Sequence, residues 1–137
     1  MEWNLDDKNR YILVYSFEFS KAFTYADMRE GFRDKDKREY IRSEAVKRFP
    51  DDIPSIKWWA FRIFVRKTNS RPFDIENVPK LIIDSFCKQQ IDRDKSKYKE
   101  LGLYKDDTID YVKVLMVGGS RSKKDFTKVE IFGALNN

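Results

Sequence analysis

The alternating stretch from Tyr11 to Phe19 is the feature that most constrains how this chain folds. Every odd-numbered position in it holds tyrosine, leucine or phenylalanine, whereas the even-numbered positions include Ser16 and Glu18. A period of two places the odd-numbered side chains on one face of a β-strand. We therefore predict a strand whose aromatic face is buried, either in the core or in a dimer interface.

Two segments have the spacing of helices. Apolar residues recur at three- and four-residue steps over positions 34–49, and Pro50 ends that pattern because proline cannot continue a helix. A second helix is expected to begin between Asp74 and Val78 and to end near Cys87. Pro79 then falls in its first turn, where backbone donors lack partners and proline is tolerated.

Three further strands are predicted, over Ser55–Lys67, Thr108–Val117 and Phe126–Phe132. The last two are expected to form a hairpin whose long basic loop spans 118–125. The resulting order is β-α-β-α-β-β. This order predicts an α+β fold with a mixed sheet and helices mainly on one face.

The chain is expected to form one domain over residues 1–137, because its length suits one core better than two. Positions 88–103 begin with the charged stretch Lys88 to Glu100, which we interpret as an exposed polar insertion. No apolar run has the length of a membrane span, and the start of the chain lacks the apolar core of a signal peptide. A cytoplasmic protein without a membrane partner is therefore expected.

Composition narrows the possible chemistry. The chain has 28 lysines and arginines against 23 acids, and this net charge of +5 favours a nucleic-acid partner. It contains no histidine and one cysteine, Cys87. Histidine-based acid–base catalysis, histidine-ligated metals and zinc–cysteine clusters are therefore excluded, and Cys87 is interpreted as a packing residue.

Acidic residues gather at two places in this basic chain. Asp74 and Glu76 lie where the second helix is expected to begin, and Asp106 and Asp107 precede a predicted strand. Mg²⁺ prefers carboxylate oxygens, and Mn²⁺ is a plausible substitute. Lys80 follows Glu76 by four residues and therefore shares its helix face. This pattern suggests a metal site for phosphodiester hydrolysis.

Ordinary structural roles explain the same residues equally well. Acids at a helix start act as caps, for which Asp74 and Asn77 are both candidates. Lys80 and Asp84 have the spacing of a surface ion pair, and Lys-Asp-Asp is a common turn composition. The basic residues of the first helix are interpreted as a solvated face because acids alternate with them: Arg38, Arg42, Lys47 and Arg48.

The motif Arg-Pro-Phe-Asp-Ile-Glu-Asn-x-x-Lys-x-x-x-Asp, followed by Lys-Asp-Asp before a strand, resembles that of the RusA-type Holliday junction resolvases. The resemblance covers about half of the chain, from Phe61 to the end. It implies a dimeric, Mg²⁺-dependent endonuclease that cuts four-way DNA junctions symmetrically. By position, Asp74, Glu76 and Asp107 match the metal-binding acids and Asp106 the first aspartate of the pair. Lys80 matches the catalytic lysine, and Asn77 and Asp84 match supporting positions.

Basic residues near these motifs are candidates for holding DNA phosphates. They are Arg62, Arg66, Lys67, Arg71, Arg121, Lys123 and Lys124. Glu76 stands where the family usually has aspartate, and together with the polar insertion this leaves a second hypothesis open. In that hypothesis the chain binds branched or single-stranded nucleic acid without cutting it. A protein-interaction domain without any nucleic-acid role is the third hypothesis.

Overall fold

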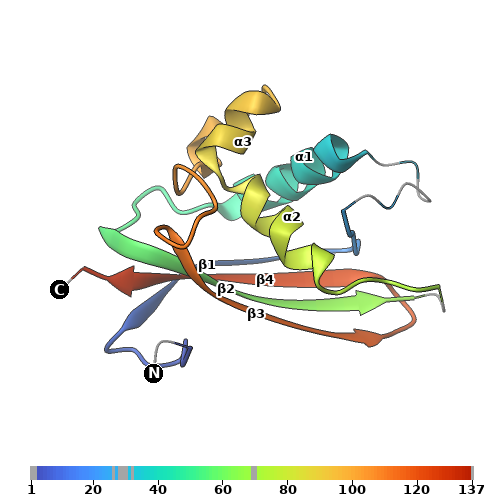
Figure 1. Cartoon of the computed structure of the whole chain (residues 1–137), viewed down its shortest axis with the longest axis horizontal. Coiled ribbons are helices and arrows are strands. Elements are labelled where there is room, and N and C mark those ends of the chain that lie inside the picture. Colours follow the sequence, from blue (N-terminus) through green and yellow to red (C-terminus); the bar gives the residue numbers. More distant parts are fainter. Residues whose placement is uncertain (1–2, 26, 28–30, 32, 69–70, 137) are drawn as a thin grey trace.

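Four strands form one mixed sheet in the spatial order β1-β4-β2-β3 (Figure 1). The computed structural model describes residues 3–25, 27, 31, 33–68 and 71–136. The strands are β1 (Tyr11–Phe19), β2 (Ile56–Lys67), β3 (Val112–Arg121) and β4 (Phe126–Leu135). The helices are α1 (Asp34–Ala45), α2 (Asn77–Ser85) and α3 (Lys88–Arg93), with short 3₁₀ turns at Val46–Arg48 and Lys99–Leu101. The predicted α+β class is confirmed, although the expected order lacked α3.

The predicted hairpin between the last two strands is wrong. β2 lies between them, pairing in parallel with β3 and antiparallel with β4. β3 also begins four residues later than expected and runs through Gly118 and Gly119 to Arg121. The connection that remains is the short turn over residues 122–125. Basic residues from the expected loop therefore lie at the end of the sheet and not on a projecting hairpin.

A β-bulge in β1 changes the face of the sheet to which the odd-numbered side chains point. Leu13 pairs with Phe132 and Tyr15 with the adjacent Ile131, so Val14 is the extra residue. Beyond the bulge, Phe17 and Phe19 are buried in the main core, whereas Tyr11 belongs to a separate cluster and Leu13 is exposed. The predicted strand is confirmed, but its aromatic residues do not share a single face.

The main core lies between the sheet and the helices, all of which are on the same side of the sheet (Figure 1). In β2 the alternation places Phe61, Ile63 and Val65 in the interior. α2 presses its apolar residues against them, and Val78, Pro79 and the run 81–83 are all buried. The position of Pro79 in the first turn of α2 agrees with the prediction.

Charged residues hold α1 in place. Arg42 is fully buried, and its guanidinium donates to the carbonyls of Ser85 at 2.8 Å and Asp84 at 3.3 Å. Lys37 is also buried and donates to the carbonyl of Thr24. The interpretation of the α1 charges as a solvated face is therefore wrong for Arg42 and for Arg38, whose side chain is 11% exposed, whereas Lys47 and Arg48 are exposed. Backbone carbonyls and carboxylates from neighbouring elements satisfy these charges in the interior.

The segment interpreted as an exposed polar insertion is exposed at most of its positions but contributes several buried residues to the interior. Residues 88–93 form α3, in which Ile91 is 1% exposed, and the following Asp94 and Ser96 are buried. Leu101 is fully buried beyond them. The expectation of exposure was wrong for these positions, because Ile91 anchors α3 in the core and the buried residues that follow it anchor the next segment.

The opposite face of the sheet carries a smaller apolar cluster. Leu5 from the N-terminal segment packs there against Tyr11, Ala60 and Phe132. The remainder of this open face includes the exposed side chains of Phe64 and Met116. Among the described residues, no helix has the length and apolar character needed to cross a membrane.

Candidate functional site

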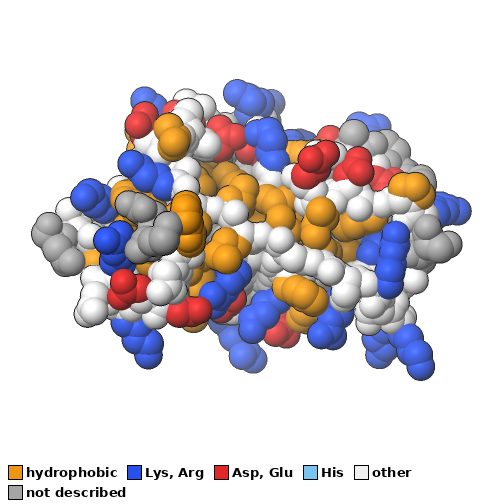
Figure 2. All heavy atoms as spheres, turned by 60° about the horizontal axis from the view of Figure 1, so that its bottom comes forward, with side chains coloured by type: hydrophobic (Ala, Val, Ile, Leu, Met, Phe, Trp, Pro, Cys, Tyr) orange, Lys and Arg blue, Asp and Glu red, His pale blue; other side chains and the backbone are white. Residues whose placement is uncertain are grey.

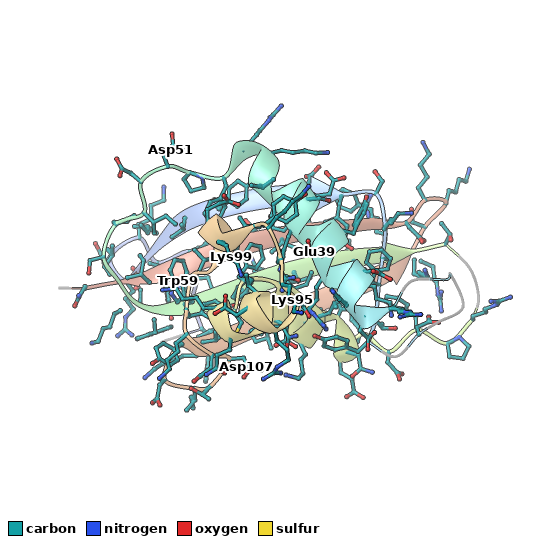
Figure 3. The ribbon with its side chains drawn as sticks, turned by 90° about the horizontal axis from the view of Figure 1, so that it is seen from above. Glu39, Asp51, Trp59, Lys95, Lys99 and Asp107 are labelled. Atoms are coloured by element: carbon teal, nitrogen blue, oxygen red, sulfur yellow. The ribbon has the colours of Figure 1, made fainter. Side chains whose placement is uncertain are left out.

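Lys80, Asp84 and Asp107 come together at the margin of the helical layer, where Figure 3 labels Asp107. Lys80 and Asp84 lie one turn apart on α2, and Asp107 comes from the loop that leads to β3. The ammonium of Lys80 is 2.8 Å from Oδ2 of Asp107 and 3.6 Å from Oδ1 of Asp84. The structure thus joins two segments that the sequence motif singled out separately.

Packing of the preceding loop fixes the position of Asp107. Tyr104 is buried, and its hydroxyl donates to the carbonyl of Ile83 at 2.6 Å. The backbone amides of Lys88 and Gln89 donate to the carbonyls of Tyr104 and Lys105. These bonds attach the loop to the start of α3 and thereby place Asp107 beside α2. The start of the polar segment at residues 88–89 therefore helps to position Asp107 in the candidate site.

The three side chains perturb one another electrostatically. The hydrogen bond with Asp107 raises the pKa of Lys80, and the same bond lowers the pKa of Asp107. Burial raises the pKa of Asp84, which is 7% exposed. The cluster therefore contains a stabilised cation, a stabilised anion and a shielded carboxyl group that is more easily protonated.

Tyr25 connects Asp84 to the interior. Its hydroxyl donates a very short hydrogen bond to Oδ2 of Asp84, and Arg38 donates to the same hydroxyl at 3.1 Å. Arg38 also donates through Nε and Nη2 to the two oxygens of Asp94, at 2.7 and 2.8 Å. Sequence reasoning missed Tyr25, since it lies in a stretch without periodicity and 59 residues from its partner.

Asp74 and Glu76 are exposed at the start of α2 and lie outside this cluster. The N-terminal end of α2 has no side-chain cap, so the alternative roles of Asp74 and Asn77 as capping residues are wrong. Glu76 is one turn before Lys80 on α2, but the ammonium of Lys80 pairs with Asp84 and Asp107. Within the described ranges, no three acidic, cysteine or histidine residues are grouped so as to hold a metal ion.

The loop that carries Asp74 and Glu76 is nevertheless docked on the sheet. Ile75 lies against Gly119 of β3, where a β-carbon would come within 2.8 Å of its Cδ1 atom. Arg121 donates to the carbonyl of Arg71 at 2.6 Å. Arg71 and Arg121 thus have a structural contact at the approach to α2.

Asp106 has a local role in the other acidic pair. Its Oδ1 accepts a hydrogen bond from the backbone amide of Thr108 at 3.1 Å, which is the contact of an Asx turn. The expected turn role of this pair therefore applies to Asp106, while Asp107 faces Lys80. The two adjacent aspartates have different surroundings.

The other predicted DNA-binding residues separate into three environments. Arg62 is paired with Glu130 at 2.8 Å and Asp6 at 3.2 Å on the open face of the sheet. Lys67 is 5% exposed and donates to the carbonyl of Ala22 and to Asp125, so its ammonium lies inside the fold. The remaining three surround one hollow at the end of the sheet: Arg66, Lys123 and Lys124.

The two carboxylates beside Lys80 are of the chemical kind that a hard divalent cation takes as ligands. Mg²⁺ binds through one or two carboxylates together with waters and phosphate oxygens. Asp107 and Asp84 supply two such carboxylates, and in the structure a cationic ammonium already lies against both. Asp74 and Glu76 are not part of this set.

Comparison with known proteins gives no independent assignment. No protein-family model matches the chain, and no curated protein matches it significantly. The function therefore has to be argued from the side chains themselves.

Proposed function

We propose that the chain is a Mg²⁺-dependent endonuclease that resolves branched DNA, with four-way junctions as the substrate. The observation that carries this proposal is the 2.8 Å contact between Lys80 and Asp107. The resemblance to the RusA-type resolvases assigns these two residues as catalytic lysine and metal-binding aspartate. Their convergence supports the resemblance because they lie 27 positions apart and on different elements.

Each residue has a defined role in this proposal. Asp107 and Asp84 would hold the cation, and a cation bound there would supply neutralisation of phosphate charge and a lower pKa of a bound water. Lys80 keeps its proton because Asp107 raises its pKa, and it stabilises the negative charge that develops on the phosphate oxygens. Tyr25 orients Asp84 through its hydroxyl. Asp74 and Glu76 extend the negative surface at the start of α2.

The proposal includes a homodimer acting in the cytoplasm. Symmetrical resolution requires two cuts, and the cluster around Lys80 supplies one set of catalytic residues per chain. Two copies related by a twofold axis provide the two sets.

Cleavage of a synthetic four-way junction tests this function. Asp107→Asn and Lys80→Met are each expected to lower the cleavage rate roughly 100-fold or more, as for the removal of other groups that stabilise a transition state. Lys99 and Asp92 form a matched control pair, since they are also exposed and 3.1 Å apart. Lys99→Met and Asp92→Asn should leave the rate unchanged. Full activity in both site variants would overturn the assignment.

A second function is favoured by one observation. Lys80 already offsets the charges of Asp84 and Asp107, and no larger acidic group is assembled among the residues that the structure describes. This arrangement suits a module that holds branched or single-stranded nucleic acid without cutting it. Junction binding in chelator, with no nicking after Mg²⁺ or Mn²⁺ is added, would support this second function over the first.

A further inference from the structure

A hollow of about 580 Å³ lies at the end of the sheet, and its lining includes no residue of the Lys80 cluster. Its lining comes from the end of β1, the end of β2 and the turn between β3 and β4: Ser20, Arg66, Ser122, Lys123, Lys124, Asp125 and Phe126. Figure 1 places this turn at the right-hand end of the molecule. At that end Figure 2 shows several lysine and arginine side chains.

The charges of this hollow are unbalanced. Asp125 is its one acidic lining residue, and its carboxylate accepts hydrogen bonds from Lys67 at 3.1 Å and from the amide of Thr68 at 2.9 Å. Arg66, Lys123 and Lys124 are exposed, and none of them forms an ion pair within the part of the chain that the structure describes. Three cations without a carboxylate partner among the described residues, beside an aspartate that is already hydrogen-bonded, are complementary to a polyanion.

Aromatic rings adjoin one of these cations, Arg66, on the open face of the sheet. The guanidinium carbon of Arg66 is 5.6 Å from the centroid of Phe64 and 5.6 Å from that of Phe126. Phe64 is 39% exposed, although a phenylalanine of a folded domain is usually buried. An exposed ring beside an arginine is the arrangement on which unpaired bases stack.

The neighbouring strand leaves the Phe64 ring accessible. Phe64 pairs with Gly118 of β3. The next β3 residue on the same face is Ser120, which pairs with Arg66. A β-carbon at position 118 would be 3.7 Å from Cδ2 of Phe64, which is an ordinary contact. A larger side chain would therefore fit at this position and would cover the ring. Glycine leaves that surface open.

We infer that this end of the sheet binds single-stranded nucleic acid, with phosphates on Arg66, Lys123 and Lys124 and an unpaired base on Phe64. Duplex bases are stacked on one another and do not present their faces, so the exposed ring favours a single strand over a duplex. The inference does not depend on cleavage, because this surface shares no residue with the Lys80 cluster.

Fluorescence anisotropy with labelled oligothymidylate and oligouridylate, in chelator, tests the inference. Lys123→Ala/Lys124→Ala is expected to weaken binding and to reduce the slope of log affinity against log salt by about 1.4, or about 0.7 per phosphate contact. Lys57→Ala/Lys97→Ala is the matched control, since it removes two exposed lysines that do not line the hollow. It should change the slope and the affinity much less.

Two further variants test the stacking separately. Phe64→Leu keeps an apolar side chain and is expected to weaken binding at least fivefold without changing the salt slope. Gly118→Leu should weaken binding similarly because it covers the ring, and its folding is checked by circular dichroism. These effects with either oligonucleotide support the inference. The oligonucleotide that binds more tightly shows whether DNA or RNA is the preferred ligand. Three results would overturn the inference. They are an equal loss of affinity in the two lysine double variants, an unchanged affinity in Phe64→Leu, and an affinity for a blunt duplex equal to that for the single strands.

Discussion

The guanidinium of Arg42 donates a hydrogen bond to Oδ2 of Asp94 at 3.0 Å, and the two side chains are only 0% and 4% exposed. Arg38 donates to both oxygens of the same carboxylate. Arg42 also donates to the carbonyl of Ser85. Its side chain therefore links α1 both to the end of α2 and, through Asp94, to the segment after α3. A buried ionic network therefore replaces part of the apolar packing between these helices.

Removing Asp94 is expected to destabilise the fold strongly. Asp94→Ala removes the buried carboxylate shared by Arg38 and Arg42 and leaves Arg42 with the partly exposed Glu39 as its acidic partner, and breaking such a buried pair typically costs about 3–5 kcal/mol. Glu44→Ala is the control, because it breaks the exposed pair with Lys47 and should cost about 0–1 kcal/mol. Urea denaturation of both variants measures the difference. Equal losses of stability in the two variants would mean that the buried pair contributes no more to the free energy of unfolding than the exposed pair does.

The same carboxylate predicts a dependence of stability on pH. Burial opposes ionisation of Asp94, but hydrogen bonds from Arg38, Gln90 and Arg42 outweigh it and lower its pKa below the ordinary 3.8. A group with a lower pKa in the folded state stabilises that state above its unfolded pKa, and the stability is lost as pH falls through the folded value. The free energy of unfolding should therefore fall below about pH 4.

Asp94→Asn removes this titration and is the direct check. Its free energy of unfolding is expected to be lower than that of the unmodified chain at neutral pH and to fall less steeply between about pH 4 and pH 2. Urea titrations at several pH values measure both slopes. Parallel pH profiles for the two proteins would show that other carboxylates cause the acid sensitivity.

α3 gives a third prediction, since its sequence alone indicated an exposed segment. Ile91→Ala is expected to cost about 2–5 kcal/mol, because Ile91 is 1% exposed and its truncation leaves a cavity. Arg93→Ala on the exposed side of the same helix should have an effect within about 0.5 kcal/mol. A small effect at both positions in urea denaturation would restore the interpretation of residues 88–100 as a peripheral insertion.

The limits of the sequence predictions follow from the range of the interactions. β1, β2 and α2 were predicted because their patterns are local and repeat within a few residues. The hairpin was wrong because strand pairing depends on distant residues, and nothing near 118–125 shows that β2 inserts between β3 and β4. The bulge at Val14 interrupts an alternation that the sequence presents as continuous.

The candidate site divides in the same way. The spacing of Lys80 and Asp84 places them on one helix face from the sequence alone, and the motif linked Asp107 to them. Tyr25 and Asp94 had no comparable signal, since their roles arise from contacts between α1, α2 and the segment after α3. Buried charges in a polar helix resemble solvated ones until the neighbouring elements are known.

Two adjacent glycines in β3 give the last prediction. At Gly119 a β-carbon would lie 2.8 Å from Cδ1 of Ile75 and 3.1 Å from both Cγ1 and the carbonyl oxygen of Val65. Gly119→Ala therefore requires the end of the Ile75 side chain to move and both Val65 contacts to widen by a few tenths of an ångström, at a cost of about 1–3 kcal/mol. At Gly118 the nearest atom is 3.7 Å away, on Phe64, and a side chain fits there.

The two substitutions should consequently have opposite signs. Gly118→Ala reduces the freedom of the unfolded chain without a clash and is expected to stabilise the fold by about 0.4–1 kcal/mol. Urea denaturation measures both changes, and the methyl resonances of Ile75 report whether the loop has moved. A shift of its methyl groups in Gly119→Ala alone would show that the Ile75 side chain packs against β3 at this position. Unchanged Ile75 resonances in that variant would show that the loop is held by other contacts.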